Sequence, residues 1–288
     1  MMPVLGAAWA LFVFATAAAF AQSSSCDRAC LRDMTTRYLE AVVARNPEML
    51  PLGPSARFTE DAVTLKLGEG LWKTATRLRP YRQDIIDVRQ GVAAAFVVIE
   101  EGATPSLVAL RLKIADRKIS EIETMVVRNQ KEGLLFEPNT LESASKAMLV
   151  VPDSSQRHPR EEAVRIAETY PGGLKIGSFV AVDAPFASGA YRLENGRLMA
   201  GPGCTFLPGC NDIKNQKIPT LAEVEHRVVA VDEEMGIVLL RLDFGAGSVR
   251  GNNDSLVVFE AFKVYGGQIH AVEAFMEVMP RGTPSGWD

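Results

Sequence analysis

The sequence predicts an α+β protein in which two copies of one module follow each other along the chain. Three observations lead to this prediction: a β-hairpin pattern that occurs twice, a helix pattern that opens each half, and a junction of proline and polar residues between the halves. Repeats of this kind decide the architecture before any motif does. Each copy is expected to contain one long helix followed by three or four antiparallel strands.

The repeated hairpin is the clearest of these observations. Residues 110–114 and 118–126 alternate apolar and polar side chains around a short turn, and residues 260–264 and 268–276 do the same in the second half. Such alternation is typical of half-buried antiparallel strands. A gapless alignment of the two hairpins pairs identical residues: Ile119 with Ile269, Lys113 with Lys263, and Glu123 with Glu273.

The similarity extends towards the start of each half. An apolar strand at residues 91–99 corresponds to one at residues 236–242. The segment that contains Arg57 corresponds, with one residue of slippage, to the segment that contains Arg192. Agreement in order across the whole half favours a duplication over a chance match.

Each half opens with an amphipathic helix, at residues 27–44 and 159–170, whose apolar side chains share one face. Between the halves, residues 136–159 contain several prolines and polar residues that break regular structure. The predicted organisation is a signal peptide at 1–21, a first module at 22–140, a linker at 141–158, a second module at 159–282 and a tail at 283–288.

The first residues predict export. Residues 4–20 are almost all apolar, and Ala19-Phe20-Ala21 fits the small-x-small pattern of a signal-peptidase site. The run is short for a membrane span and no basic cluster follows it. We therefore expect a secreted or periplasmic protein that has no membrane contact after cleavage, with an uncleaved anchor as the alternative.

The composition is that of a globular protein with a buried core, at 47% hydrophobic and 23% charged residues. A net charge of −4 argues against a nucleic-acid partner, which requires a concentrated basic surface. The expected partner is a small-molecule ligand or substrate.

The four cysteines form two close pairs, Cys26 with Cys30 and Cys204 with Cys210. In an exported chain this count predicts disulfides, and no histidine lies at zinc-ligand spacing from a cysteine. The connectivity stays open. The second pair can close its own loop, whereas the first pair lies one turn apart, which is awkward inside a regular helix. Cross-pairing between the two clusters is the alternative.

The pattern resembles the nuclear transport factor 2-like superfamily, also called SnoaL-like or ketosteroid-isomerase-like. It looks most like secreted two-module members of uncharacterised function from fungi and bacteria. The residues that carry the resemblance are 26–31, 38–39, 57–61 and 119–123 in the first half, and 192–196, 227–233 and 266–272 in the second.

The resemblance implies two cones, each a bent antiparallel sheet wrapped around an N-terminal helix, with a mostly apolar pocket and no cofactor. Relatives include cofactor-independent isomerases, dehydratases, cyclases, epoxide hydrolases and carbon–carbon lyases, and one group releases formaldehyde from lignin-derived diarylpropane diols. Many relatives are not enzymes, so the fold alone assigns no reaction. Dimerisation through the open sheet face is common for the fold, which implies a homo-oligomer.

The last hairpins carry the first candidates for acid–base catalysis. Glu123 and Glu273 occupy the same position in both copies, and burial inside a cone would raise the pKa of either carboxyl and suit it to proton transfer. A solvated convex face is the alternative, because strand register decides between them. His270 stands where the first copy has Ser120. It lies on the opposite strand face from Glu273, so at most one of the two points inward.

Tyrosines and arginines of the first half are candidate donors. Tyr38 lies on the inward face of the first helix, either to donate to a substrate oxygen or as a core residue. The cationic segment Arg77, Arg79, Tyr81 and Arg82 is a candidate receptor for an acidic or phenolic ligand at the mouth of the first cone. A solvated edge strand is the alternative for this segment.

Two arginine–glutamate pairs occur at matching places, Arg57 with Glu60 and Arg192 with Glu194. They are expected to form ion pairs at the rims of the cones or to orient a ligand oxygen.

In the second half, Arg241 and Asp243 interrupt an apolar strand, and His226 and Arg227 precede it. These residues predict a more polar interior in the second cone, with a solvated strand face as the alternative.

The sequence contains no phosphate-binding glycine loop, no nucleophile elbow and no metal-spaced histidine pair. It therefore favours a cofactor-independent acid–base enzyme, a lyase in preference to a dehydratase or isomerase, acting on a small, largely apolar, oxygenated and aromatic molecule. The alternative is a periplasmic binding or scaffold protein without chemistry. A cavity with convergent polar groups distinguishes the two, and residues present in only one copy point to the second cone.

Overall fold

The computed structural model describes residues 25–219, 221, 223–245, 253–284 and 287. The predicted signal peptide and its cleavage site lie outside these residues. Within the described part of the chain, no helix is long and apolar enough to cross a membrane.

The first module packs one long helix against a sheet. Helix α1 (Arg28–Ala44) begins after Asp27, whose side chain accepts a hydrogen bond from the backbone N of Cys30 at 2.9 Å. This contact satisfies one of the free N–H groups at the start of the helix. The strands are β1 (Leu52–Glu60), β2 (Val63–Leu65), β3 (Ala75–Asp87), β4 (Val92–Glu101), β5 (Thr104–Ala115) and β6 (Lys118–Val127). The short helix η1 (Pro47–Met49) precedes β1, and the short helix α2 (Leu71–Thr74) lies between β2 and β3.

The second module repeats this order. Helix α5 (Arg160–Ile176) opens it and ends at Gly177, which adopts a left-handed conformation with φ of 74°. The strands are β7 (Phe186–Glu194), β8 (Arg197–Ala200), β9 (Val224–Asp232), β10 (Ile237–Phe244), β11 (Asp254–Tyr265) and β12 (Gln268–Pro280). The connecting segment carries α3 (Gln130–Gly133), η2 (Pro138–Thr140), α4 (Lys146–Leu149) and η3 (Ser154–Gln156).

Both sheets have the same six-stranded order, β2-β1-β6-β5-β4-β3 and β8-β7-β12-β11-β10-β9. The predicted helices, hairpins and apolar strands are all present, and the fold consists of two nuclear transport factor 2-like cones. The expected three or four antiparallel strands are six, and the first strand of each module pairs parallel with the last, β1 with β6 and β7 with β12. This pairing joins distant segments, so local alternation could not indicate it.

The bend of each sheet comes from matching irregularities. The β5–β6 register shifts between Lys113 and Ile114, and the β11–β12 register shifts at the equivalent Lys263 and Val264. Such bulges bend a strand and increase its twist. Each concave face buries its own helix, α1 in one apolar core and α5 in another.

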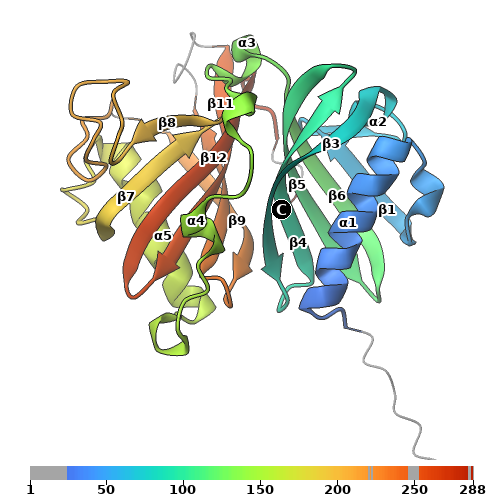
Figure 1. Cartoon of the computed structure of the whole chain (residues 1–288), viewed down its shortest axis with the longest axis horizontal. Coiled ribbons are helices and arrows are strands. Elements are labelled where there is room, and N and C mark those ends of the chain that lie inside the picture. Colours follow the sequence, from blue (N-terminus) through green and yellow to red (C-terminus); the bar gives the residue numbers. More distant parts are fainter. Residues whose placement is uncertain (1–24, 220, 222, 246–252, 285–286, 288) are drawn as a thin grey trace, which may run out of the picture.

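The convex faces of the two sheets pack against each other. Their side chains form a third apolar core shared by both modules, in which Phe96 of β4 stacks on Phe275 of β12 with ring centroids 4.7 Å apart. Figure 1 shows the two sheets back to back in the middle of the molecule, with α1 and α5 away from that contact. The open sheet face, through which dimerisation was expected, is therefore covered in each module by the other module.

The contact between the modules is reciprocal. Arg28 of α1 donates to both carboxylate oxygens of Asp232 at 2.7 and 2.9 Å, and the backbone N of Ile86 donates to the same aspartate at 3.0 Å. In the mirrored arrangement, Arg160 of α5 donates to Asp87 at 2.5 Å. The backbone N of Val231 donates to that same aspartate at 2.9 Å. The modules thus meet in the self-complementary manner of a two-fold symmetric dimer.

Strand register corrects the sequence alignment of the copies. Phe58 lies opposite Ile122 in the first sheet, and Arg192 lies opposite Val272 in the second. Because Ile122 and Val272 are equivalent in the repeated hairpin, the counterpart of Arg192 is Phe58, and the counterpart of Arg57 is Tyr191. The sequence alignment, which paired Arg57 with Arg192, was therefore wrong by one residue.

The lysines that both copies keep have the same structural role. The Nζ atom of Lys113 donates to the backbone O of Gln90 at 2.5 Å, and the Nζ atom of Lys263 donates to the backbone O of the equivalent Met235. Lys263 also donates to the backbone O of Met148 at 3.3 Å, which ties α4 to the second sheet. These lysines therefore belong to the scaffold.

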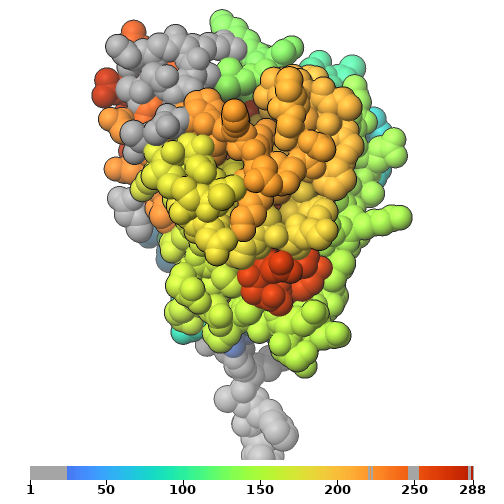
Figure 2. Space-filling view, turned by 90° about the vertical axis from the view of Figure 1, so that its left-hand side faces the viewer, coloured from blue at the N-terminus to red at the C-terminus, as the bar shows by residue number. Residues whose placement is uncertain are grey.

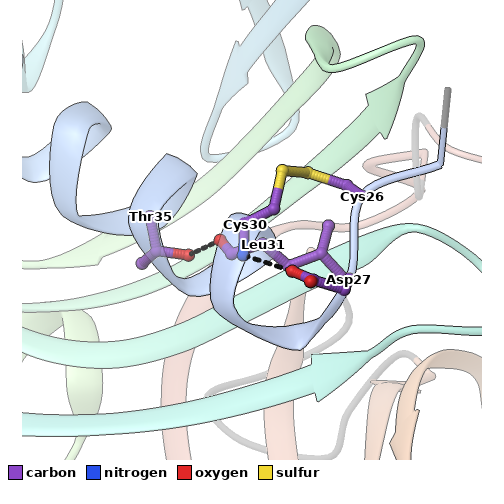
Figure 3. Close-up of a disulfide and its surroundings, with 5 residues drawn as sticks. All are labelled: Cys26, Asp27, Cys30, Leu31 and Thr35. Atoms are coloured by element: carbon purple, nitrogen blue, oxygen red, sulfur yellow. Dashed lines mark hydrogen bonds between the residues drawn. A yellow bond between two sulfur atoms is a disulfide. The ribbon is translucent and has the colours of Figure 1, made fainter. Parts of the chain in front are cut away.

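Both disulfides are local. Cys26 bonds to Cys30 and Cys204 bonds to Cys210, so cross-pairing does not occur. The first pair avoids the strain of a regular helix because Cys26 precedes the helix start, as Figure 3 shows. The second closes the loop after β8, where the backbone N of Gly201 donates to the backbone O of Cys210 at 2.7 Å. In Figure 2, the gold segment around this loop forms the upper part of the face of the second module.

A carboxyl pair between the modules makes stability depend on pH. Burial and the neighbouring Glu60 raise the pKa of Asp61 to about 7, and burial and Asp61 raise the pKa of Glu277 to about 10. Both values exceed the pKa of about 4 expected in the unfolded chain, so this contribution to stability is fully present below that value and is lost as pH rises towards the folded values.

We expect this pair to lower the free energy of unfolding by roughly 1–3 kcal/mol between pH 6 and 9, and Glu277→Gln to remove most of that share of the slope. Urea unfolding at several pH values measures it. Glu142→Gln, on an exposed residue of the connecting segment, is the control and should keep the slope. An unchanged slope in Glu277→Gln would contradict the assignment.

Candidate active site

The second cone contains a cavity of about 340 Å³ between α5 and the concave face of its sheet. Its walls are mostly apolar, with side chains such as Leu174, Phe244 and Met276. Four polar side chains converge on it: Tyr170, Arg192, Glu194 and Glu260. An apolar cavity with a few convergent polar groups is the usual form of a small-molecule site.

Local structure explains why these four residues meet. Tyr170 lies on the buried face of α5, four residues before Leu174, so that both point into the cone. Arg192 and Glu194 are two residues apart on β7 and share its inner face. Glu260 of β11 lies on the same strand face as Val258 and Phe262, which both belong to the second core.

Arg192 organises the polar group. Its Nη1 atom donates to the hydroxyl of Tyr170 at 3.2 Å, and its Nε atom lies 2.7 Å from a carboxylate oxygen of Glu194. This places the guanidinium between the tyrosine and the first glutamate. The predicted pairing of Arg192 with Glu194 is present, inside the cavity.

Glu260 has an unusual protonation state. Burial, followed by the nearby Glu194, raises the pKa of the Glu260 carboxyl to about 8, although Arg192 and a hydrogen bond with Tyr170 oppose this shift. Glu260 is only 3% exposed. At neutral pH it is therefore mainly a neutral carboxylic acid, which donates a hydrogen bond.

The first cone is filled at the equivalent positions. Tyr38 is the counterpart of Tyr170, but its ring packs edge-on against Trp72 with centroids 5.5 Å apart, and burial raises the pKa of its hydroxyl. Phe58 stands in place of Arg192 and Leu110 in place of Glu260, both in the apolar core. Tyr38 therefore lies in the core, and its hydroxyl is buried with it and does not reach the surface.

Neither Glu123 nor Glu273 points into a cone. Both lie on convex faces, which are covered by the opposite module and are not solvated, so the structure matches neither of the two expected surroundings. Glu273 accepts a hydrogen bond from the hydroxyl of Tyr191 at 2.6 Å, and burial raises the pKa of its carboxyl. Tyr81 is buried in the same shared core, near Phe275, rather than at the mouth of the first cone.

The second-half charges gather between the modules, not inside the second cone as expected. Arg227 donates to Glu123 at 2.6 Å, and Arg241 forms an ion pair with Asp243. Arg241 and Asp243 face outward because residues 238, 240, 242 and 244 of the same strand, β10, supply the inner face. His226 instead contacts Glu168 of α5 at 2.9 Å.

The remaining first-half candidates have structural partners. Arg77 and Arg79 both bind Glu100, at 2.6 and 2.9 Å, on the edge strand β3 that the alternative foresaw. Arg82 donates to Asp84 at 2.7 Å.

The predicted pair of Arg57 and Glu60 is not formed. Arg57 stacks on Trp287, 3.7 Å from the ring centroid, while Glu60 binds Arg128 at 2.7 Å. The two residues are three apart on a strand and so face opposite sides.

His270 lies outside the cavity. Its ring stacks on Tyr265 with centroids 3.6 Å apart, and one ring nitrogen lies 3.1 Å from the backbone O of Tyr265. Burial lowers the pKa of this histidine.

Sequence reasoning missed Tyr170 and Glu260 as site residues. The gapless hairpin alignment already placed Glu260 opposite Leu110, a charged residue against an apolar one in a half-buried strand. That difference was the available signal.

Residues 24–126 and 156–276 match the model of a family described as a domain of unknown function, DUF8021. The chain belongs to this family. Its two matched segments coincide with the two cones of this DUF8021 protein. No curated protein matches the chain.

Two solved structures are similar to parts of this DUF8021 protein. One is a de novo designed protein with a curved β-sheet, at 20% identity and a TM-score of 0.30, covering 36% of this chain and 91% of its own. The other is an NTF2-like protein of unknown function from Shewanella baltica OS155, at 16% identity and a TM-score of 0.29, covering 42% of this chain and 93% of its own. At these TM-scores, neither similarity indicates a function.

Proposed function

We propose that the second cone is the active site of a cofactor-independent acid–base enzyme acting on a small, largely apolar, oxygenated molecule. The observation that carries the proposal is the set of Arg192, Tyr170, Glu194 and Glu260 inside an otherwise apolar cavity. The first cone, with apolar residues at two of these positions, serves as scaffold. The apolar N-terminal run and the two disulfides support action in a secreted or periplasmic compartment.

Each polar residue has a role in this chemistry. Arg192 donates to the oxygen of Tyr170, which directs the tyrosine proton away from the guanidinium, towards Glu260 in the free protein and towards a substrate oxygen when one is bound. The neutral acid of Glu260 supplies a second donor and passes its proton to that oxygen as negative charge develops there. The Glu194 carboxylate is the proton acceptor.

Such a site supports proton abstraction next to a carbonyl, elimination, or carbon–carbon cleavage of a diol, in which Glu194 takes a hydroxyl proton and Glu260 protonates the leaving hydroxyl, to give an aldehyde, an alkene and water. Among these we favour a lyase. The apolar walls favour an aromatic substrate, and release of formaldehyde from a lignin-derived diarylpropane diol is the specific reaction to test first. The cavity volume lies at the lower end of the range for ligand sites, which favours small substrates.

The test is a crystal soaked with a panel of phenolic, hydroxy-acid and diarylpropane compounds, combined with a search for products by mass spectrometry. We expect ligand density in the second cone and turnover of at least one compound. Density there without turnover would indicate a binding protein. Density only at the surface between the modules would contradict the proposal.

A variant that restores first-cone residues tests the same site from the other side. Arg192→Phe combined with Glu260→Leu should fold with a loss of at most about 3 kcal/mol, because two buried polar groups become apolar while Glu194 loses its guanidinium partner. It should lose ligand binding. Thermal unfolding and calorimetric titration measure the two effects, and retained binding would exclude the cavity as the ligand site.

A further inference from the structure

A second cavity lies between the modules, on the opposite sheet face from the second cone. It has a volume of about 350 Å³ and is bordered by Arg111 and Lys113 of β5, Arg227 of β9, and Trp287 near the end of the chain. We call this space the inter-module cleft.

Three guanidinium groups surround Glu123 beside this cleft; those of Arg111 and Arg241 are buried and that of Arg227 is half-buried. Each has one carboxylate partner: Arg111 binds Glu121 at 2.7 Å, Arg227 binds Glu123 at 2.6 Å, and Arg241 binds Asp243. Arg111 also approaches Glu123, with 3.8 Å between its Nη1 atom and Oε2 of the carboxylate. The residues come from both modules, so that the site exists only when the modules are packed together.

The hydrogen-bond donors of this cluster exceed its acceptors. Among the described residues, Nη1 of Arg111, Nε of Arg227 and Nη2 of Arg241 are buried without a hydrogen-bond partner, and the only comparable acceptor in the cluster is Oε2 of Glu123. Buried donors are almost always satisfied, so unpaired donors indicate a missing acceptor. A ligand that supplies oxygen acceptors would complete the cluster.

The charge of the cleft also favours an anion. Its charged border consists of Arg111, Lys113, Arg160 and Arg227 against one carboxylate, Glu121. Asp87 neutralises Arg160, and Glu123 neutralises Arg227. Lys113 then remains as a positive charge whose amine contacts a backbone carbonyl, which suits a monoanion.

The two-fold arrangement of the modules shows that the scaffold does not need the charges of Arg111 and Arg241. The counterpart of Arg241 is Phe96 and the counterpart of Arg111 is Ala261, and both belong to the shared apolar core. On that side, Phe96 and Phe275 stack and close the space. The scaffold therefore needs no arginine at these two positions, and Arg111 and Arg241 serve a different purpose.

We propose that the inter-module cleft binds a small carboxylate anion, with Arg111 and Arg227 as its donors. Arg241 lies behind them, and its charge attracts Glu123 and repels Arg227. Trp287 forms one wall, with its ring 5.5 Å from the guanidinium of Arg111. This site is separate from the second cone and does not depend on the reaction there.

The test uses the full mature chain with acetate and benzoate as probes, at constant ionic strength with chloride as the reference anion. Binding is followed by calorimetry and by tryptophan fluorescence, with Trp287→Phe identifying the signal from the cleft. We expect saturable binding of a carboxylate, weakened at least tenfold by Arg111→Ala. Arg89→Ala, on an exposed arginine that also spans the modules, is the matched control and should bind as the wild type does.

Arg111→Ala places at this position the residue that its counterpart already has. If it fails to fold, Arg111→Lys keeps the charge but loses the planar fork of donors and should still weaken binding. The variant with Arg192→Phe and Glu260→Leu should bind the probes unchanged, which separates the cleft from the second cone. No binding beyond that of chloride, or equal binding by wild type and the Arg111 variants, would overturn the proposal.

Discussion

Replacing Asp232 by alanine is expected to lower the free energy of unfolding by about 3–5 kcal/mol, because it removes the buried carboxylate that binds Arg28 and two backbone N–H groups at the contact between the modules. Asp232 is fully buried and accepts hydrogen bonds from Arg28, Ile86 N and Met235 N. Its loss therefore breaks two links to the first module and one within its own turn. Urea unfolding measured by circular dichroism gives the change.

The control is another ion pair between the modules. Arg89 and Glu161 lie 3.2 Å apart, but their side chains are 55% and 71% exposed. Arg89→Ala should therefore cost at most about 1 kcal/mol. Asp87→Ala, at the reciprocal position, should match Asp232→Ala within about 1 kcal/mol because the contacts are equivalent. A loss below about 1 kcal/mol in both aspartate variants would show that the apolar core alone holds the modules together.

The second large effect concerns the proposed chemistry. Glu260→Gln should reduce kcat/KM for a substrate by about 10²–10⁴-fold, since the amide cannot transfer a proton. Because Glu260 acts as an acid whose pKa is about 8, wild-type activity should fall as pH rises through that value. Steady-state kinetics across pH 6–10 measures both effects.

Glu273→Gln is the matched control for this experiment. Glu273 is also buried and lies on the neighbouring strand, where it pairs with Ala261, next to Glu260, but its side chain faces the other module. Its activity should stay within about threefold of the wild type, well below the effect of losing a proton-transfer residue. Equal losses in the two variants would mean that the carboxylates act through stability, and not through proton transfer.

Much of the architecture was readable from the chain alone. Alternation around residues 115–117 and 265–267 located the two long hairpins, and the helical periodicity located α1 and α5. These signals are local, because each element buries one face and the spacing of apolar residues records which face that is. The duplication followed from comparing them.

The site was only partly predictable. Arg192 and Glu194 were singled out and do line the second cone, whereas Glu123, Arg227, Arg241 and Asp243 lie between the modules. Alternation shows that two faces differ but not which face meets the helix, and the continuous apolar strands at residues 91–99 and 236–242 do not indicate what covers their second face. Glu260 was not predicted as a site residue because its role depends on the cavity of the second cone, which the sequence does not show.

The sequence by itself determined that this protein has two related helix-and-sheet modules, where their strands run, and that its cysteines occur as two close pairs. Only the tertiary structure decided that the modules pack back to back, that the first cone is filled and the second is hollow, and which buried charges meet. The physical reason is the distance along the chain between the residues that determine each feature. Secondary structure records the burial of neighbouring residues, whereas a cavity or an ion-pair cluster depends on side chains brought together from strands that are distant in the chain.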